Sequence, residues 1–517
     1  MTASKITTPL DRFTEIGELS TKVRGTIKRV IAPLAILSAI EAGYLNFSGH
    51  AGAVAFGMIA LGTCIALIGW SQSAIGVPLL PMMAVQSLVI YGVPIVVSHE
   101  DITAYPASFV LQAGVEVLLF NVAMVLAWGA GMQLFFPSRP VSYALQEFNR
   151  TGAQGWSRLG FILVMVATGT QFVEGLDFGS ALVASLPTGS SSILYALLSV
   201  ASACGFFLIS LVVGGTEISA VGKIVFWVLL IVNAMIMASG FLLSSAAASL
   251  ITVAIGFFWS NGRIPWRYLT IVMLTLSFMN SGKYAMRARY WASDESLGSQ
   301  VSPVQLPAVY AEWVDSSLDA YLENNSASPV SALESASPKK TSQTLLDRVD
   351  NLQNLLFIID AIKVGHAKPL EGATYTLIPP LLVPRILWPD KPRTHEGQIL
   401  LNVHFGRQDL YSTYTTYVAW GLLPEAYANF GSFVGSICIG SVLGLFFAWV
   451  ENLSARKLVV SLEGFLALNL LMSLMNSFEM VASVLVTSTF QSMIVVICAC
   501  LPFVHRTVTP RREIGGT

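Results

Sequence analysis

Residues 51–70 read AGAVAFGMIALGTCIALIGW and contain no charged side chain. A helix of about 20 apolar residues is long enough to cross the roughly 30 Å hydrocarbon core of a bilayer. Only 11% of the 517 residues are charged, against about 25% in an ordinary water-soluble domain. A water-soluble protein of this length needs more charged side chains than this on its surface. The sequence therefore predicts a polytopic membrane protein, an all-α bundle of transmembrane helices.

Eleven further stretches meet the same criterion of length and apolar composition, which predicts about 12 spans in all. They divide the chain into an N-terminal tail (1–29), nine helices (30–281), one large loop (282–429), three helices (430–503) and a C-terminal tail (504–517). The 12 predicted spans are 30–47, 51–70, 76–97, 108–136, 158–176, 191–214, 222–239, 241–259, 266–281, 430–450, 458–476 and 480–503.

The distribution of Lys and Arg predicts the orientation, because basic residues concentrate in short cytoplasmic loops. With the N-terminus inside, the inside segments hold 17 of the 29 Lys and Arg, and the short outside loops hold none. The other 12 lie in the 282–429 loop, and long loops do not obey the rule. We therefore predict cytoplasmic termini and an extracytoplasmic 282–429 loop. The net charge of −1 leaves no basic excess for binding nucleic acid.

The apolar helices carry few groups with chemistry of their own. The five cysteines lie in apolar runs without a CxxC pair, which speaks against a disulfide framework or a zinc site. Gly129 and Gly131 are expected to permit close helix packing. Acids at membrane depth are costly and often functional, although a hydrogen-bonded structural carboxyl is an equal alternative. These acids are Glu41, Glu116, Glu174, Glu463 and Glu479.

The large loop has three parts that differ in composition. A Ser-rich stretch ending near residues 324–340 predicts a flexible linker. An amphipathic helix follows, expected to lie on the membrane surface or against the other helices. Five prolines between residues 379 and 392 then predict a segment without regular helix. The apolar stripe of the helix is Leu345, Val349, Leu352, Leu356 and Ile359.

The proline segment, IPPLLVPRILWPDKP at 378–392, is the most distinctive stretch of the loop. Arginine grips phosphate through a planar fork and lysine adds a point charge, while the Trp388 ring offers a face for a sugar. Cations on the outer side of a membrane indicate an anionic partner there, and simple solvation of the loop is the alternative. A lipid-linked pyrophosphate carrying a glycan fits this combination.

Four stretches resemble the oligosaccharide repeat-unit polymerases of bacterial surface polysaccharides, the O-antigen polymerase or Wzy-type family. The resemblance covers roughly residues 235–435. The stretches are the proline segment together with residues 372–375, PEAYANFG at 424–431, SGFLLSS at 239–245 with GRIP at 262–265, and the Arg-x-Arg at 287–289.

This resemblance implies a GT-C-like membrane glycosyltransferase of the bacterial inner membrane. Such an enzyme transfers the growing chain from undecaprenyl pyrophosphate to the next lipid-linked repeat unit, and a chain-length regulator and a flippase are its expected partners in the lipid bilayer. Two alternatives remain. An O-antigen ligase shares the helix count and the outer loop, and the proline segment favours the polymerase over it. A transporter or flippase of lipid-linked oligosaccharide is the non-enzymatic reading.

The resemblance also implies roles for individual residues of the loop. A base is needed for the acceptor hydroxyl, and we expect Glu425, then His395 and Asp350. The leaving pyrophosphate needs cations, whereas the loop lacks a clustered acid motif, so we expect no metal and no cofactor. Arg407 lies outside the motifs, and its substitution is expected to be nearly silent for polymerisation. The expected pyrophosphate ligands are Arg287, Arg289, Arg348, Arg385, Lys391 and Arg393, and the expected sugar-stacking rings are Trp388, Tyr375 and Tyr427.

Overall fold

A computed structural model describes residues 15–508 apart from 51, 137–138, 140, 177–178, 180, 182–184, 186–189, 216–217, 291–300, 327–349, 384–387, 389, 415–417 and 478. The described chain is helical except for one two-stranded sheet. It divides into two compact units, of which unit 1 comprises residues 1–13 and 145–348 and unit 2 comprises residues 14–144 and 349–517.

Ten described helices are long and apolar enough to cross a membrane, which confirms the polytopic helical bundle. Two of the 12 predicted spans are not among them. The 458–476 span contains a helix of only 14 residues, Leu462–Met475. The 266–281 span lies in a longer helix, Trp266–Tyr290, in which Thr, Ser, Asn and Tyr interrupt the apolar residues.

Unit 1 contains six helices in its described part: α7 (Gln146–Glu174), α9 (Ser190–Gly215), α10 (Ala220–Ala238), α11 (Leu243–Asn261), α12 (Trp266–Tyr290) and α13 (Leu306–Ser326). In three of these helices, α7, α9 and α11, glycines let the backbones of neighbouring helices approach closely. A Cβ added at Gly160 of α7 would lie 2.9 Å from the Gly205 carbonyl oxygen of α9, and one at Gly256 of α11 would meet the Ser210 side chain of α9. Small residues therefore set the helix spacing, as is usual between membrane helices.

Helix α13 was not predicted, because the sequence around it is polar. Its core contact is Trp313, a fully buried ring whose Nε1 donates a 2.8 Å hydrogen bond to the Met279 carbonyl of α12. Gly282 of α12 lets the Ser317 backbone approach, since a Cβ there would lie 2.6 Å from the Ser317 nitrogen. One aromatic side chain and one glycine thus hold α13 against α12 in unit 1.

Unit 2 is built from both ends of the chain. Its N-terminal part contains α1 (Ile16–Phe47), α2 (Ala53–Ser73), α3 (Leu79–Ser87), η2 (Leu88–Gly92), α4 (Val93–Val96), α5 (Glu100–Thr103), α6 (Ala107–Leu134) and β1 (Val141–Leu145). Its C-terminal part contains α15 (Leu352–Lys363), η4 (Tyr375–Leu377), α16 (Ile378–Leu382), α17 (Glu396–His404), η5 (Ser412–Tyr414), α18 (Leu422–Phe430), α19 (Val434–Ser454), α20 (Leu462–Met475), α21 (Ala482–Cys500), η6 (Leu501–Phe503) and β2 (Val504–Val508).

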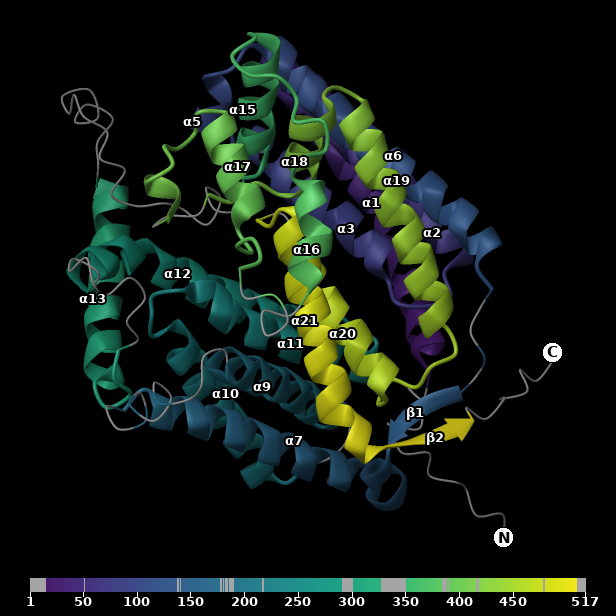
Figure 1. The fold of residues 1–517 in the computed structure, drawn as a ribbon, viewed down its shortest axis with the longest axis vertical. Helices are drawn as coiled ribbons and strands as arrows, with labels where there is room; N and C mark the ends of the chain where they lie inside the picture. The colour runs from purple at the N-terminus through teal and green to yellow at the C-terminus, as the bar shows by residue number, and fades with distance from the viewer. Residues whose placement is uncertain are drawn as a thin grey trace. The chain divides into compact units, whose positions relative to one another are not determined.

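Helices α6 and α19 form the central pair of unit 2 and lie side by side (Figure 1). Gly440 and Gly444 of α19 face the α6 backbone so closely that no side chain fits between them. On α6, a Cβ at Gly131 would lie 2.6 Å from the Ala448 Cβ, whereas one at Gly129 would meet nothing within 4 Å. The expected packing role is therefore confirmed for Gly131 and wrong for Gly129.

Two buried carboxylates bind the α19 helix into unit 2. Both Glu116 oxygens of α6 accept the Phe433 N–H at 3.1 Å, and one also accepts the Ser436 hydroxyl at 2.5 Å. Glu116 thus satisfies donors at the start of α19, which favours an anionic group. Of the two readings offered for this acid, the contacts support the structural one.

Glu451, near the other end of α19, is a second structural carboxylate that the sequence analysis did not single out. It accepts the indole N–H groups of Trp70 at 3.1 Å and Trp128 at 2.8 Å. It also accepts the backbone N–H groups of Ile75 at 2.8 Å and Gly76 at 3.2 Å, in the link between α2 and α3. Four donors from three segments compensate the burial of this acid.

The large loop agrees with one of its predictions and differs from another. Leu352, Leu356 and Ile359 of α15 are fully buried, and α15 packs against α6 and α18, so the amphipathic helix lies against other helices. Its predicted start, residues 345–349, lies outside the described residues. The expected absence of helix in the proline segment is wrong at residues 378–382, where Pro379 and Pro380 occupy the first turn of α16. Proline is tolerated there because first-turn N–H groups need no helical acceptor.

Candidate functional site

The PEAYANFG stretch forms the short helix α18, and this helix holds the most deeply buried acid among the predicted site residues. Gly421 before it and Gly431 after it both have positive φ, 83° and 73°, a conformation that glycine adopts without strain. Between them Glu425 and Asn429 lie one turn apart, and the Asn429 amide donates a 2.8 Å hydrogen bond to the Glu425 carbonyl. The two glycines therefore set both ends of the helix that presents Glu425.

The Glu425 carboxyl is fully buried beside the first residue of α21. Its Oε2 accepts a 2.6 Å hydrogen bond from the Ala482 N–H. Its Oε1 has no hydrogen-bond partner in the part of the chain that the structure describes. Burial is the largest influence and raises the pKa of this carboxyl to about 7, while polar interactions with Ala482 and Thr374 act in the opposite direction. A carboxyl with such a pKa exchanges protons near neutral pH.

Residues 370–375 close the same cluster from a second segment. The backbone N–H groups of Leu370 and Glu371 donate to the carbonyls of Ala428 and Asn429 at 3.0 and 2.8 Å. The Asn429 amide donates to the Thr374 hydroxyl at 2.8 Å. We call Glu425, Asn429, Thr374, Tyr375 and Ala482 the Glu425 cluster; it joins three segments of unit 2.

Tyr375 places a second proton-carrying group in the Glu425 cluster. Its ring stacks on Phe430 with 5.7 Å between centroids and 5° between planes. Its hydroxyl is buried without a hydrogen-bond partner among the described residues. Burial and the nearby Glu425 charge raise the pKa of this phenol, so the hydroxyl stays protonated and able to donate.

The other two predicted acid–base residues lie in unit 2 but outside the Glu425 cluster. His395 precedes α17, and its Nδ1 lies 2.7 Å from the Gln398 Oε1. Asp350 precedes α15, accepts the Gln353 N–H at 3.1 Å and lies 3.6 Å from the His99 Nδ1. Asp350 therefore caps a helix and pairs with a histidine.

The predicted pyrophosphate ligands are divided between the two units and the residues that the structure does not describe. Lys391 of unit 2 is buried and donates to the carbonyls of Leu381 at 2.8 Å and Val383 at 2.6 Å, while Arg393 is exposed. Arg287 and Arg289 belong to unit 1. Arg348 and Arg385 lie outside the described residues.

The two unit 1 arginines are both engaged at the end of α12. Arg287 donates a 2.9 Å hydrogen bond to the Phe241 carbonyl, and Phe241 itself has a positive φ of 57°. Arg289 forms an ion pair with Glu312 of α13. Both side chains thus have protein partners, and their predicted phosphate role stays a prediction.

The three predicted stacking rings differ sharply in exposure. Trp388 is 42% exposed and presents an open aromatic surface. Tyr427 is 1% exposed, and its hydroxyl accepts from the Gln112 amide at 2.8 Å and lies 3.0 Å from the Ser432 hydroxyl. Tyr375 has one face covered by Phe430. Trp388 is thus the most exposed of the three rings, Tyr375 is partly exposed, and a stacking role for Tyr427 requires movement of the surrounding chain.

Arg407 has tertiary contacts that the sequence did not predict. Its guanidinium carbon lies 5.3 Å from the ring centroids of both Phe357 and Trp420, a distance at which a cation and an aromatic ring attract each other. It also donates to the Asn354 side chain. These contacts indicate a role in stability, and the expectation that its substitution is nearly silent for polymerisation stays a prediction. The sequence alone does not reveal this role, because Arg407 meets the aromatic residues only when the chain folds.

The Arg407 neighbourhood continues into a hydrogen-bonded network next to α18. The Asn354 amide donates to the Ala419 carbonyl at 3.0 Å, and the Trp420 indole donates to the Asn402 side chain at 2.8 Å. These contacts fix residues 419 and 420 immediately before Gly421 and α18. The network thereby supports the helix that carries Glu425.

Comparison of the chain with protein-family models, with curated proteins and with solved structures finds no match.

The donor set of the site also bears on metal binding. Among the described residues no group of three or more His, Cys, Asp or Glu side chains converges in a way that could hold a metal ion. What the Glu425 cluster offers instead is proton transfer: one carboxyl with a raised pKa and one protonated phenol.

Proposed function

We propose that this chain is a bacterial membrane glycosyltransferase that joins oligosaccharide repeat units, carried on undecaprenyl pyrophosphate, into a surface polysaccharide. The observation that carries the proposal is the Glu425 carboxyl, which is fully buried, has one oxygen without a hydrogen-bond partner among the described residues and has a pKa of about 7. It belongs to one of the stretches that resemble the repeat-unit polymerases.

In the proposed reaction Glu425 accepts the proton of the acceptor hydroxyl. The hydroxyl oxygen then bonds to the anomeric carbon of the growing chain, and the bond from that carbon to the pyrophosphate oxygen breaks. Undecaprenyl pyrophosphate leaves with the electron pair of the broken bond. General-base catalysis of this kind contributes about 10²–10⁴ in rate, so the base is worth testing first.

The remaining roles follow from the same reaction. Positioned cations stabilise the charge on the departing pyrophosphate, and Arg287, Arg289, Arg348, Arg385, Lys391 and Arg393 are the proposed donors. The exposed Trp388 ring is proposed to stack on an acceptor sugar. The proposal places the termini in the cytoplasm and the Glu425 cluster on the outer side of the inner membrane, where a flippase delivers the substrate.

The test is polymerisation by the purified protein in proteoliposomes supplied with lipid-linked repeat units. The wild type should build a ladder of products, also in excess EDTA. Glu425→Gln should slow product formation at least about 100-fold. Glu371→Gln is the matched control, because Glu371 is an exposed acid of the same loop, and it should retain the wild-type rate.

Cells lacking the protein separate the proposal from its alternatives. Loss of the proposed polymerase leaves single repeat units on the cell surface. Free, unattached polymer would indicate a ligase instead, and absence of any repeat unit outside would indicate a flippase. Equal rates for wild type and Glu425→Gln, with both proteins at equal levels in the membrane, would refute the role of Glu425.

A further inference from the structure

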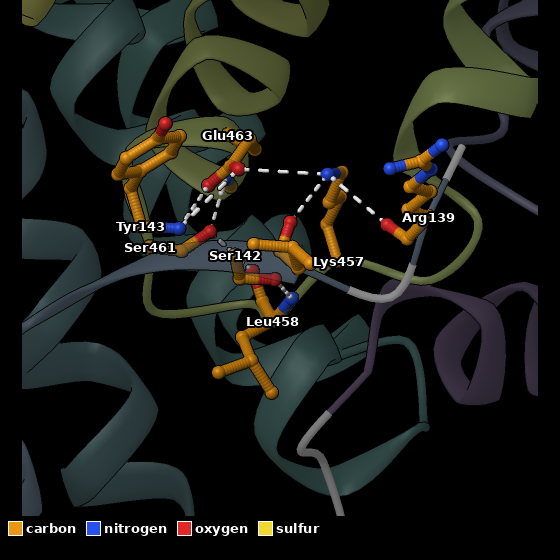
Figure 2. Close-up of polar contacts among 9 residues, drawn as sticks. Arg139, Ser142, Tyr143, Lys457, Leu458, Ser461 and Glu463 are labelled. Carbon is orange, nitrogen blue, oxygen red and sulfur yellow. Dashed lines mark hydrogen bonds and ion pairs between the residues drawn. The ribbon is translucent and has the colours of Figure 1, made fainter. Parts of the chain in front are cut away.

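A second polar assembly lies at the opposite end of α19, where residues 455–461 connect α19 to α20. The Lys457 Nζ donates to the Val141 carbonyl at 2.5 Å and to the Arg139 carbonyl at 3.4 Å, and lies 3.7 Å from a Glu463 oxygen. The Tyr143 N–H donates to Glu463 at 3.1 Å. Figure 2 shows Lys457 and Glu463 side by side over strand β1.

An apolar crevice of about 640 Å³ begins at this assembly and runs between α19, α20 and α21. Lys457 and Glu463 line one end of it. The remainder is lined almost entirely by hydrocarbon side chains, among them Phe446, Leu470 and Phe490. The crevice is therefore amphipathic along its length, with charge at one end and hydrocarbon beyond it.

One of the three helices that line the crevice, α20, is shorter than the other two. α20 has 14 residues, which corresponds to about 21 Å of helix and falls short of the roughly 30 Å hydrocarbon core. α19 and α21, with 21 and 19 residues, come closer to the full thickness. Exposed apolar side chains at the crevice, such as Val442 and Phe490, favour a surface that faces membrane lipid, where a lipid chain is the natural occupant.

The charge around the crevice selects the headgroup of that lipid. Arg456 precedes Lys457, Arg139 contacts it through its carbonyl, and Arg506 lies on β2, which pairs with β1. All three arginines are exposed. Glu463 is the acid that lines the crevice, and Lys457 together with the Tyr143 N–H offsets its charge. Glu15, which pairs with Leu458 beside Lys457, is a second acid here. Four basic residues against two acids leave an excess of positive charge, which favours an anionic headgroup.

We infer that this crevice binds an anionic phospholipid, with one acyl chain between α19, α20 and α21 and the phosphate next to Lys457. Unit 1 provides a contrast, because its apolar crevice of about 690 Å³ between α10, α11 and α12 has no charged residue among its described lining residues. Of these two crevices, the one in unit 2 joins a hydrocarbon channel to a cation. The binding is independent of the proposed polymerase activity.

The test uses the full-length protein in nanodiscs that contain either phosphatidylglycerol or phosphatidylcholine with identical chains, a few per cent of each carrying a photoreactive acyl group. Irradiation followed by peptide mass spectrometry should place phosphatidylglycerol crosslinks on crevice-lining segments of α19, α20 and α21. Phosphatidylcholine should label them about fivefold less, since one basic residue near an anionic headgroup contributes about a fivefold preference.

Two variants separate headgroup recognition from the shape of the crevice. Lys457→Gln should abolish the preference for phosphatidylglycerol, whereas Lys223→Gln, at an exposed lysine of α10 in unit 1, should preserve it. Val442→Trp should block labelling by both lipids, because Val442 lines the crevice and is 62% exposed, so the added ring needs no core rearrangement. Equal labelling by the two lipids, or an unchanged preference in Lys457→Gln, would overturn the inference.

Discussion

Gly444 of α19 lies directly against the Met124 backbone of α6: a Cβ added at Gly444 would stand 2.1 Å from the Met124 carbonyl oxygen. A backbone oxygen cannot yield as the end of a flexible side chain does. The two helices therefore approach each other as closely as they do because position 444 has no side chain.

Gly444→Ala should accordingly destabilise the protein. Forced separation of packed helices costs about 1–3 kcal/mol or more, and the melting temperature in detergent should fall. Gly129→Ala on α6 is the matched control, since nothing lies within 4 Å of its added Cβ. Alanine is the better helix former by about 1 kcal/mol, so the control should melt at or above the wild-type temperature. Equal losses for both variants would contradict the packing argument.

The raised pKa of Glu425 predicts opposite pH dependences for stability and for activity. The folded-state pKa, about 7, lies above the ordinary value of 4.5, so the folded protein holds the proton more tightly than the unfolded chain. Its contribution to stability is complete below pH 4.5 and is lost as the pH rises through 7. Activity as a general base needs the ionised form and should rise over the same window.

Glu425→Gln isolates this contribution. The stability of the wild type relative to the variant should decrease between pH 4.5 and 8, by up to about 3 kcal/mol, as measured from thermal melts at fixed salt. The matched acid Glu371→Gln should leave the pH profile unchanged. A wild-type stability curve that runs parallel to that of Glu425→Gln would show that the carboxyl titrates normally.

Arg407→Ala should destabilise unit 2, a cost that the sequence did not predict. The substitution removes the cationic contact with Phe357 and Trp420 and the hydrogen bond to Asn354. Interactions of this kind are worth about 0.5–2 kcal/mol for the ring contact and about 1.5–3 kcal/mol for a charged hydrogen bond, so the melting temperature should fall by several degrees. Lys368→Ala, at an exposed cation of the same loop, should have no measurable effect.

The charge asymmetry of the loops predicts the orientation of the chain. A periplasmic reporter fused after Ser328 should be active, and a cytoplasmic reporter fused after Thr509 should be active. The physical reason is the retention of short basic loops in the cytoplasm. Cytoplasmic activity from the Ser328 fusion would reverse the orientation and, with it, the proposed outer location of the Glu425 cluster.

The sequence by itself determined that this is a multi-span helical membrane protein, because uncharged runs of helix length have few other stable environments. It also singled out PEAYANFG as a stretch with a candidate base. Span counting was less secure where composition is mixed. The polar residues of α12 and the 14 residues of α20 keep both helices outside the ten that are long and apolar enough to cross a membrane alone.

Only the tertiary structure decided what the individual charged residues contact. Glu425 is distinguished from Asp350 by the N-terminus of α21, 57 residues further along the chain, and by its complete burial. Lys391 is engaged by two carbonyls, and Arg407 by two rings. Local propensity and periodicity report on neighbours in sequence, whereas burial, hydrogen bonding and pKa depend on groups that meet only when distant segments pack together.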